Sequence, residues 1–141
     1  MNQSTELSVN HKHNQTFSAN PTFRWTLTLG LTPGYNPEVK ERVDLDAIGA
    51  TYREIAQRVY ESTGVYVSAT VVESRALYAR DWGCPPGGEP TATFSGSCNP
   101  AFAEPKAYRV ALDEIVRALK ERYRQETVLL EITPCETVYY K

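Results

Sequence analysis

The sequence has only two histidines, His11 and His13, and both lie near the N-terminus. The rest of the chain therefore has no histidine to serve as a general base, which excludes Ser-His-Asp and Cys-His arrangements there. The GxSxG, GxxxxGKS/T, HExxH and paired CxxC motifs are also missing. No cysteine or carboxylate follows the two histidines at a spacing useful for a metal site, so we expect neither a metal nor a cofactor.

The chain also lacks a basic excess, long apolar runs and a cysteine framework. Its formal net charge is -2, so we expect no nucleic-acid partner. The apolar runs are only a few residues long, which predicts no membrane span. Three cysteines and no export signal favour a reduced protein in the cytoplasm, or in the host cytoplasm if a phage encodes it. The alternative is that Cys84 and Cys98 pair across a hairpin in an oxidising compartment.

The composition changes after the first 20 residues. Residues 1–20 are rich in Asn, Gln, Ser, Thr and Lys and have too few apolar side chains to offset the entropy cost of ordering. We therefore predict a flexible arm over residues 1–20. Residues 21–141 are enough for one domain with its own core.

Period-two and helical patterns alternate along this domain. Apolar residues at 23, 25, 27, 29 and 31 alternate with polar residues or glycine and predict a strand with one buried face. A helix is expected within residues 44–63, with Asp44 as its N-cap and Gly64 just beyond its end. Further strands are expected at residues 65–78 and 91–95.

The second half of the chain repeats the pairing of a helix with a strand. Apolar residues from Tyr108 to Tyr123 fall at helical spacing, and residues 127–133 have the composition of a strand. Residues 135–140 extend this strand beyond Pro134. The order strand, helix, strand, strand, helix, strand predicts an α+β ferredoxin-like split βαβ sandwich, with a four-stranded antiparallel sheet and both helices on one face. Such a sheet leaves its edges exposed, so we expect a homo-oligomer.

Arginines and large rings alternate ahead of a Pro-Pro-Gly-Gly turn. Rings can stack on a base, and a guanidinium group can bind two phosphate oxygens at once. Both kinds of contact suit an anionic nucleotide. The alternative, given equal weight, is that the rings cover a core edge while the arginines pair with Glu73, Asp81 and Glu89. Adding the aromatic residue before the second helix and an arginine after it, the predicted ligand-binding residues are Arg75, Tyr78, Arg80, Trp82, Phe102 and Arg124.

The polar residues at the end of the second helix also have a structural interpretation. Arg122 and Arg124 lie where cations offset the unpaired carbonyl groups of a helix C-terminus. Gln125 could instead bridge the backbone of this junction to a neighbouring strand, and Glu126 could do the same.

The junction motif Arg122-x-x-Gln125-Glu126-Thr127-Val128, with Glu89-Pro90-Thr91 at the third strand, resembles a group of small bacterial and phage proteins of split βαβ type. One branch is a bacterial family of unknown function. Over residues 23–132 the chain is also similar in size and element order to the phage Thoeris anti-defence sponge family. That resemblance implies a small oligomer that sequesters cyclic ADP-ribose signals without cleaving them.

The leading hypothesis from the sequence is thus a non-catalytic protein that sequesters an anionic nucleotide signal. One alternative is an interaction module or inhibitor that binds a protein partner and no small molecule. Another is a small ferredoxin-like enzyme, for which Asp44, Asp46 or Glu126 would have to lie in a cleft.

Overall fold

The computed structural model describes residues 17–32 and 43–141 and has the predicted order of elements. Helices and strands follow one another as two similar halves joined by a hairpin that contains a short 3-10 helix, η1. The elements are β1 (Phe17–Gly30), α1 (Leu45–Thr63), β2 (Thr70–Ala76), η1 (Arg80–Trp82), β3 (Glu89–Ser97), α2 (Pro105–Arg122) and β4 (Leu129–Tyr140).

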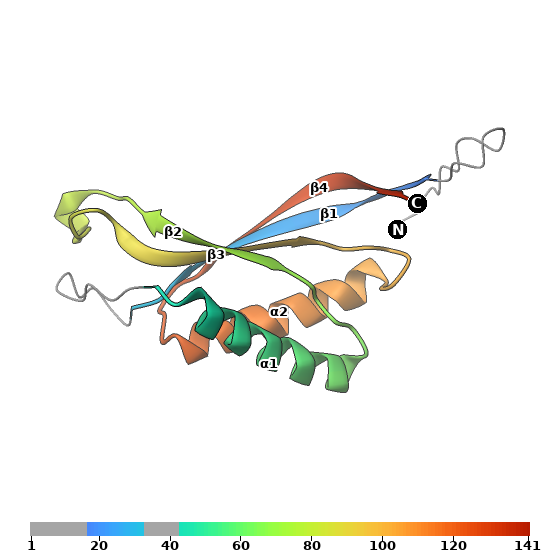
Figure 1. The fold of residues 1–141 in the computed structure, drawn as a ribbon, viewed down its shortest axis with the longest axis horizontal. Helices are drawn as coiled ribbons and strands as arrows, with labels where there is room; N and C mark the ends of the chain where they lie inside the picture. The colour runs from blue at the N-terminus through green and yellow to red at the C-terminus, as the bar shows by residue number, and fades with distance from the viewer. Residues whose placement is uncertain (1–16, 33–42) are drawn as a thin grey trace.

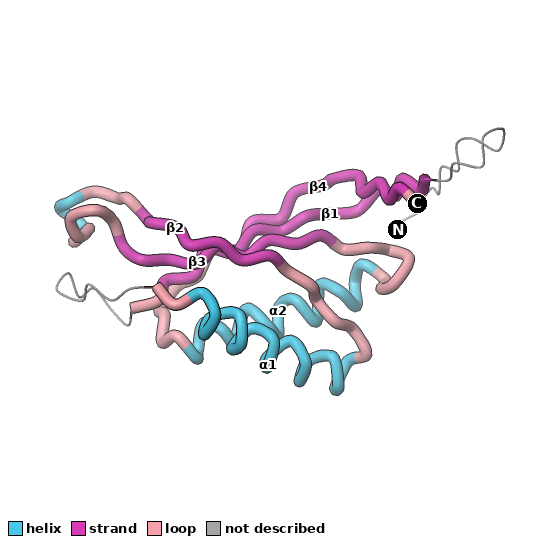
Figure 2. The backbone as a smooth tube through the Cα atoms, in the orientation of Figure 1, coloured by secondary structure: helices cyan, strands magenta, loops and turns pink. Residues whose placement is uncertain are grey.

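The four strands form one antiparallel sheet in the order β2-β3-β1-β4. Figure 1 shows both helices on the same face of this sheet, and Figure 2 shows that β1 and β4 continue together well beyond the helices. This arrangement confirms the ferredoxin-like split βαβ sandwich. It also leaves the opposite face of the sheet without helices, and we call that surface the helix-free face.

The core lies between the sheet and the two helices. Trp25, Leu27 and Leu29 alternate along β1 with at most 1% of their surface exposed, so the period-two pattern seen in the sequence corresponds to burial. Phe94 on β3 is stacked on Tyr52 of α1, with ring centroids 5.1 Å apart. Burial of this apolar surface is the main term that favours folding.

The ends of the first helix follow its predicted caps. The Asp44 carboxylate accepts a hydrogen bond from the Ala47 backbone N–H at 3.1 Å. Gly64 ends the helix with φ 80°, a conformation that glycine adopts without steric cost. These local signals fix where α1 begins and ends.

All four strands differ in extent from the sequence prediction, and β3 is two residues longer at each end than the predicted residues 91–95. β1 begins at Phe17, so residues 17–20, expected in the arm, pair with the end of β4; residues 1–16 lie outside the described part of the chain. β2 is shorter than expected because residues 65–69 cross from α1 before the ladder starts. β4 runs unbroken through Pro134, since an edge strand can leave the missing N–H of proline on its unpaired side.

The three cysteines are free. Cys84 precedes β3 and Cys98 follows it, which separates them by roughly 25 Å at about 3.3 Å per strand residue. This distance rules out the alternative in which they form a disulfide. In the described part of the chain, no helix is long and apolar enough to cross a membrane.

A buried hydrogen bond links the central strand to the second helix. Trp25 Nε1 donates to the Tyr108 hydroxyl at 2.8 Å, and Phe23 meets the same tyrosine ring edge to face at 5.6 Å. Burial raises the pKa of Tyr108 to about 12. The hydroxyl therefore stays neutral and available as the acceptor for the indole N–H.

Replacing Tyr108 by Phe would leave the Trp25 indole N–H buried without an acceptor. We expect Tyr108→Phe to lower the free energy of unfolding by about 1–3 kcal/mol, the usual cost of an unpaired buried donor, as measured by urea denaturation. Tyr60, which is 45% exposed, provides the control Tyr60→Phe. Equal losses of stability in the two variants would contradict this role for the Tyr108 hydroxyl.

Candidate functional site

The helix-free face carries a row of small hydroxyl side chains. Because Trp25, Leu27 and Leu29 point toward the helices, the residues between them and their cross-strand partners point the other way. The hydroxyl residues on this face are Thr26, Thr28, Thr70, Ser74, Thr91, Thr93 and Ser95. Val72 and Leu129, 55% and 58% exposed, lie among them.

At one end of this face, side chains from separate elements converge on Gly30, the last residue of β1. A methyl group added at Gly30 would overlap the Gln125 amide oxygen and would lie 3.1 Å from Glu89 Oε1. The absence of a side chain at Gly30 is therefore what lets a carboxylate and an amide approach the same point. Sequence reasoning did not identify these two side chains as neighbours of Gly30.

Gln125 is held in place by two hydrogen bonds of its amide nitrogen. Nε2 donates to the Thr32 carbonyl at 2.9 Å and to the Tyr123 carbonyl at 3.0 Å. Gln125 thus bridges the helix junction as predicted, except that its partner Thr32 lies two residues beyond the end of β1 rather than in the strand. With both N–H groups used, the amide oxygen is left to face the space beside Gly30.

Glu89 is held by a tyrosine from the other side of the hairpin. The Tyr78 hydroxyl donates to Glu89 Oε2 at 3.3 Å. Tyr78 was one of the predicted ligand-binding residues, whereas Glu89 was considered as an ion-pair partner and as part of the motif at the third strand. The two residues give the site a carboxylate and a hydroxyl that flank the beginning of β3.

A hydroxyl network supports the strands that carry these groups. Ser74 Oγ lies 2.7 Å from Thr91 Oγ1 and 2.8 Å from Thr93 Oγ1. Thr91 pairs with Gly30 in the ladder and is only 3% exposed. Hydrogen bonding satisfies this buried hydroxyl and fixes β2 against β3 beside the site.

The structure brings together only some of the residues predicted from the sequence. Arg75, Arg80 and Trp82 lie on or beside the same hairpin as Tyr78, but all three are exposed. Arg75 contacts Glu73 at 3.8 Å, which is the ion pair that the structural alternative proposed. Trp82 is 74% exposed, so it does not cover the core.

The remaining two predicted residues lie elsewhere. Arg124 adopts φ 55° just after α2, next to Gln125, and its side chain is exposed. Phe102 lies in the loop between β3 and α2, which Figure 1 shows at the end of the sheet opposite the β2–β3 hairpin. Phe102 therefore does not share a site with Tyr78, because the length of β3 separates them.

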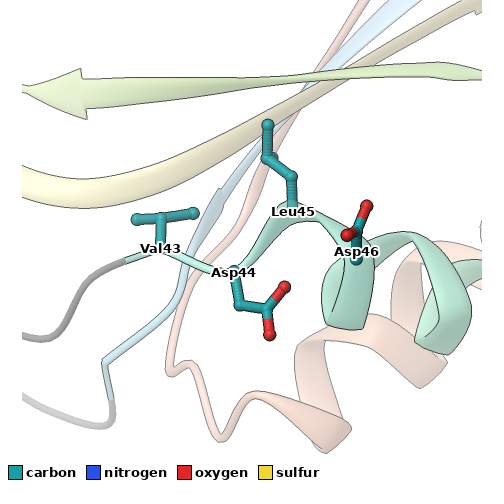
Figure 3. A pocket seen from close by; sticks show the side chains of 4 residues that line it. All are labelled: Val43, Asp44, Leu45 and Asp46. Atoms are coloured by element: carbon teal, nitrogen blue, oxygen red, sulfur yellow. The ribbon is translucent and has the colours of Figure 1, made fainter.

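Two of the carboxylates that the enzyme alternative would require, Asp44 and Asp46, line a different hollow. This hollow is shallow and lies at the start of α1, with Leu45 between the two aspartates directed toward the sheet (Figure 3). The Asp44 carboxylate is occupied in capping the helix. Among the described residues, no group of three or more His, Cys, Asp or Glu could hold a metal ion.

A family model described as SAM lyase matches residues 20–141. The chain belongs to the SAM lyase family. A solved phage SAM lyase in the apo state aligns with a TM-score of 0.54 and 15% identity over 86% of this chain and 90% of that chain. A phage SAM lyase in complex with S-methyl-5'-thioadenosine aligns with a TM-score of 0.50 and 14% identity over 85% and 90%. No curated protein matches the chain.

Family membership overturns the prediction of a non-catalytic sponge. A lyase breaks a covalent bond in its substrate, so SAM lyases are enzymes and do not merely sequester a ligand. The predicted resemblance to small phage proteins agrees with the two solved structures, but the family is not the Thoeris sponge family. At such low identity these structures support the fold alone. The molecule bound in one of them is an uncharged thioether nucleoside, unlike the anionic nucleotide we expected.

Gly30 provides a direct test of the geometry of this candidate site. We expect Gly30→Ala to lower the free energy of unfolding by about 0.5–1.5 kcal/mol, because the added methyl would displace the Gln125 side chain from its hydrogen bonds to the Thr32 and Tyr123 carbonyls. It should also shift the Gln125 side-chain amide resonances in NMR spectra.

Gly49 in α1 is the matched control, since nothing lies within 4 Å of an added Cβ there. Gly49→Ala should raise stability, by up to about 1 kcal/mol, because alanine is the better helix former. Unchanged Gln125 resonances in Gly30→Ala would show that the glycine is not what admits this side chain.

Proposed function

We propose that this protein cleaves S-adenosylmethionine into S-methyl-5'-thioadenosine and homoserine lactone. The family match over residues 20–141 carries the proposal. The relative solved with S-methyl-5'-thioadenosine contributes the chemical detail. This compound keeps the adenosyl group, the sulfur and the methyl group, so the bond that breaks joins the sulfur to Cγ of the methionyl part.

The reaction balances without water or a metal. The methionyl carboxylate of the substrate attacks its own Cγ and forms a carbon–oxygen bond that closes a five-membered lactone. The sulfur–Cγ bond breaks and its electron pair remains on sulfur, which becomes a neutral thioether. The α-ammonium group keeps its proton and its charge throughout, so the net charge of +1 passes to the lactone.

This chemistry explains how a site without histidine could be catalytic. The substrate supplies the nucleophile as an ionised carboxylate, so no general base has to activate it. The protein has to fold the substrate so that the carboxylate faces Cγ opposite the sulfur, and such positioning alone can give large accelerations. Opposite charges are neutralised in the transition state, so removal of the reacting groups from water favours the reaction.

The cluster around Gly30 offers groups for this positioning. The Glu89 carboxylate and the Gln125 amide oxygen are acceptors suited to the α-ammonium group, the one charge that persists. The Tyr78 hydroxyl, which donates to Glu89, can instead orient the substrate carboxylate. Of the other predicted residues, Trp82 presents an exposed ring on the same hairpin for stacking on adenine.

We also propose that the protein acts as a homo-oligomer. β2 and β4 have unpaired edges within the described sheet, and the helix-free face exposes Val72 and Leu129. A second copy placed there would cover this apolar surface and screen the site from water. Light scattering on the purified protein would measure its mass, and a monomer would contradict this part of the proposal.

Product analysis in ¹⁸O water tests the reaction. We expect S-adenosylmethionine to give S-methyl-5'-thioadenosine and homoserine lactone whose ring oxygen carries no label, because that oxygen comes from the substrate carboxylate. Mass spectrometry distinguishes this from hydrolysis, which would place ¹⁸O on Cγ of homoserine. Labelled Cγ–oxygen, or no consumption of substrate, would contradict the proposal.

Variants of the Glu89 and Tyr78 pair test the site. Glu89→Gln and Tyr78→Phe should each lower kcat/KM roughly 10- to 100-fold, the loss expected for a hydrogen bond to a charged group. Glu73→Gln is the control, since Glu73 is an exposed carboxylate on neighbouring β2 that pairs with Arg75. Full activity in both site variants, with intact folding by circular dichroism, would exclude this cluster from catalysis.

A further inference from the structure

The helix-free face is laid out in rows of residues that pair with one another across the strands. The row beside Gly30 crosses all four strands and consists of Val72, Thr93, Thr28 and Leu129. The apolar residues Val72 and Leu129 lie at its two ends, 55% and 58% exposed, and the threonines between them are small. No bulky side chain in the middle of this row would keep a second sheet from packing at the usual separation of about 10 Å.

The next two rows add one residue of each charge. Thr26 pairs with Glu131, and Arg24 lies two residues before Thr26 on the same strand, so Arg24 and Glu131 share the helix-free face. Both side chains are exposed, and neither takes part in an ion pair among the described residues. At the paired positions of the described sheet, the other charged residue on this face is Glu89, which belongs to the candidate site.

A face that carries one unpaired cation and one unpaired anion is complementary to itself. When two copies lie face to face about a two-fold axis, the arginine of each copy can contact the glutamate of the other, and both contacts form together. Each contact is a charge-assisted hydrogen bond, which is stronger than one between neutral groups. A partner of a single charge sign would pair with one of the two residues and repel the other. The charges therefore favour a second copy of this chain as the partner.

We propose that the helix-free faces of two copies pack together, with Arg24 of each copy paired with Glu131 of the other. The proposal rests on the homo-oligomer of the proposed function, for which it names the contacts, and it is independent of the proposed reaction. Gly30 lies in the row beside that of Val72 and Leu129 on the same face. The second copy would therefore border the candidate site.

Charge reversal of each residue tests the contacts. Arg24→Glu and Glu131→Arg would each bring like charges together at both contacts between two copies. We expect each variant to raise the dissociation constant between copies at least about 100-fold, since facing like charges are strongly unfavourable in an interface. Sedimentation velocity over a concentration series measures this constant. The double variant Arg24→Glu/Glu131→Arg should assemble as the wild type does, because its reversed charges are again opposite.

Mixing the two single variants distinguishes a contact between copies from one within a chain. In the mixture, every contact between unlike copies joins opposite charges, so mixed oligomers should form although neither variant assembles alone. If Arg24 and Glu131 acted on each other within one chain, each variant would keep its two like charges and the mixture would gain nothing. A mixture that stays unassembled, with both variants folded by circular dichroism, would overturn the proposal.

Arg53→Glu and Glu114→Arg are the matched controls. They make the same charge changes at exposed residues of α1 and α2, on the other side of the sheet (Figure 1). Both variants should keep the mass of the wild type. Equal dissociation constants for Arg24→Glu and Arg53→Glu would overturn the proposal, because the position of the charge on the helix-free face would then have no effect.

The test separates this interface from the proposed reaction, because assembly is measured without substrate. Loss of assembly in the single variants and its recovery in their mixture would support the interface even in a protein that cleaves no S-adenosylmethionine, which would refute the reaction alone. An oligomeric wild type whose mass neither single variant changes would overturn this interface and leave the homo-oligomer. A monomeric wild type would overturn both.

Discussion

The alternation of side chains along β1 is the constraint on which the rest of the structure depends. β1 is an inner strand, paired with β3 on one side and β4 on the other. Its residues Trp25, Leu27 and Leu29 form the centre of the core, and the positions between them form the helix-free face. Because side chains alternate between the two faces of a strand, a shift of the strand register by one residue would exchange these two sets. The same pairing thus fixes both the core and the place of the site.

The candidate site depends on the end of this strand. Gly30 leaves room for Glu89 from β3 and for Gln125 from the junction of α2 and β4. Gln125 in turn bonds to the carbonyls of Thr32 and Tyr123, so the end of the second helix is tied to the end of the first strand. The site is therefore assembled from both halves of the fold, and neither half contains it alone.

The proposed reaction accounts for what the site lacks. A carboxylate that attacks within its own molecule needs no histidine and no activated water. What remains for the protein is to hold a small cation in one conformation in a dry site. An acceptor pair such as Glu89 and Gln125, with Tyr78 as a donor, is enough polar chemistry for that task. A search for familiar catalytic motifs therefore led to the wrong prediction of a protein without catalysis.

The sequence by itself determined the fold class, the buried face of β1 and the caps of α1, because each depends on local periodicity or on a residue with a special backbone preference. Asp44 and Gly64 ended the helix where their chemistry predicts. Tyr78 and Gln125 were also recognised, but as parts of different features. Only the tertiary structure decided that Tyr78, Glu89 and Gln125 meet beside Gly30, and that Phe102 lies at the far end of the sheet. These residues are far apart in the chain, and strand pairing, which local sequence does not encode, sets which of them become neighbours.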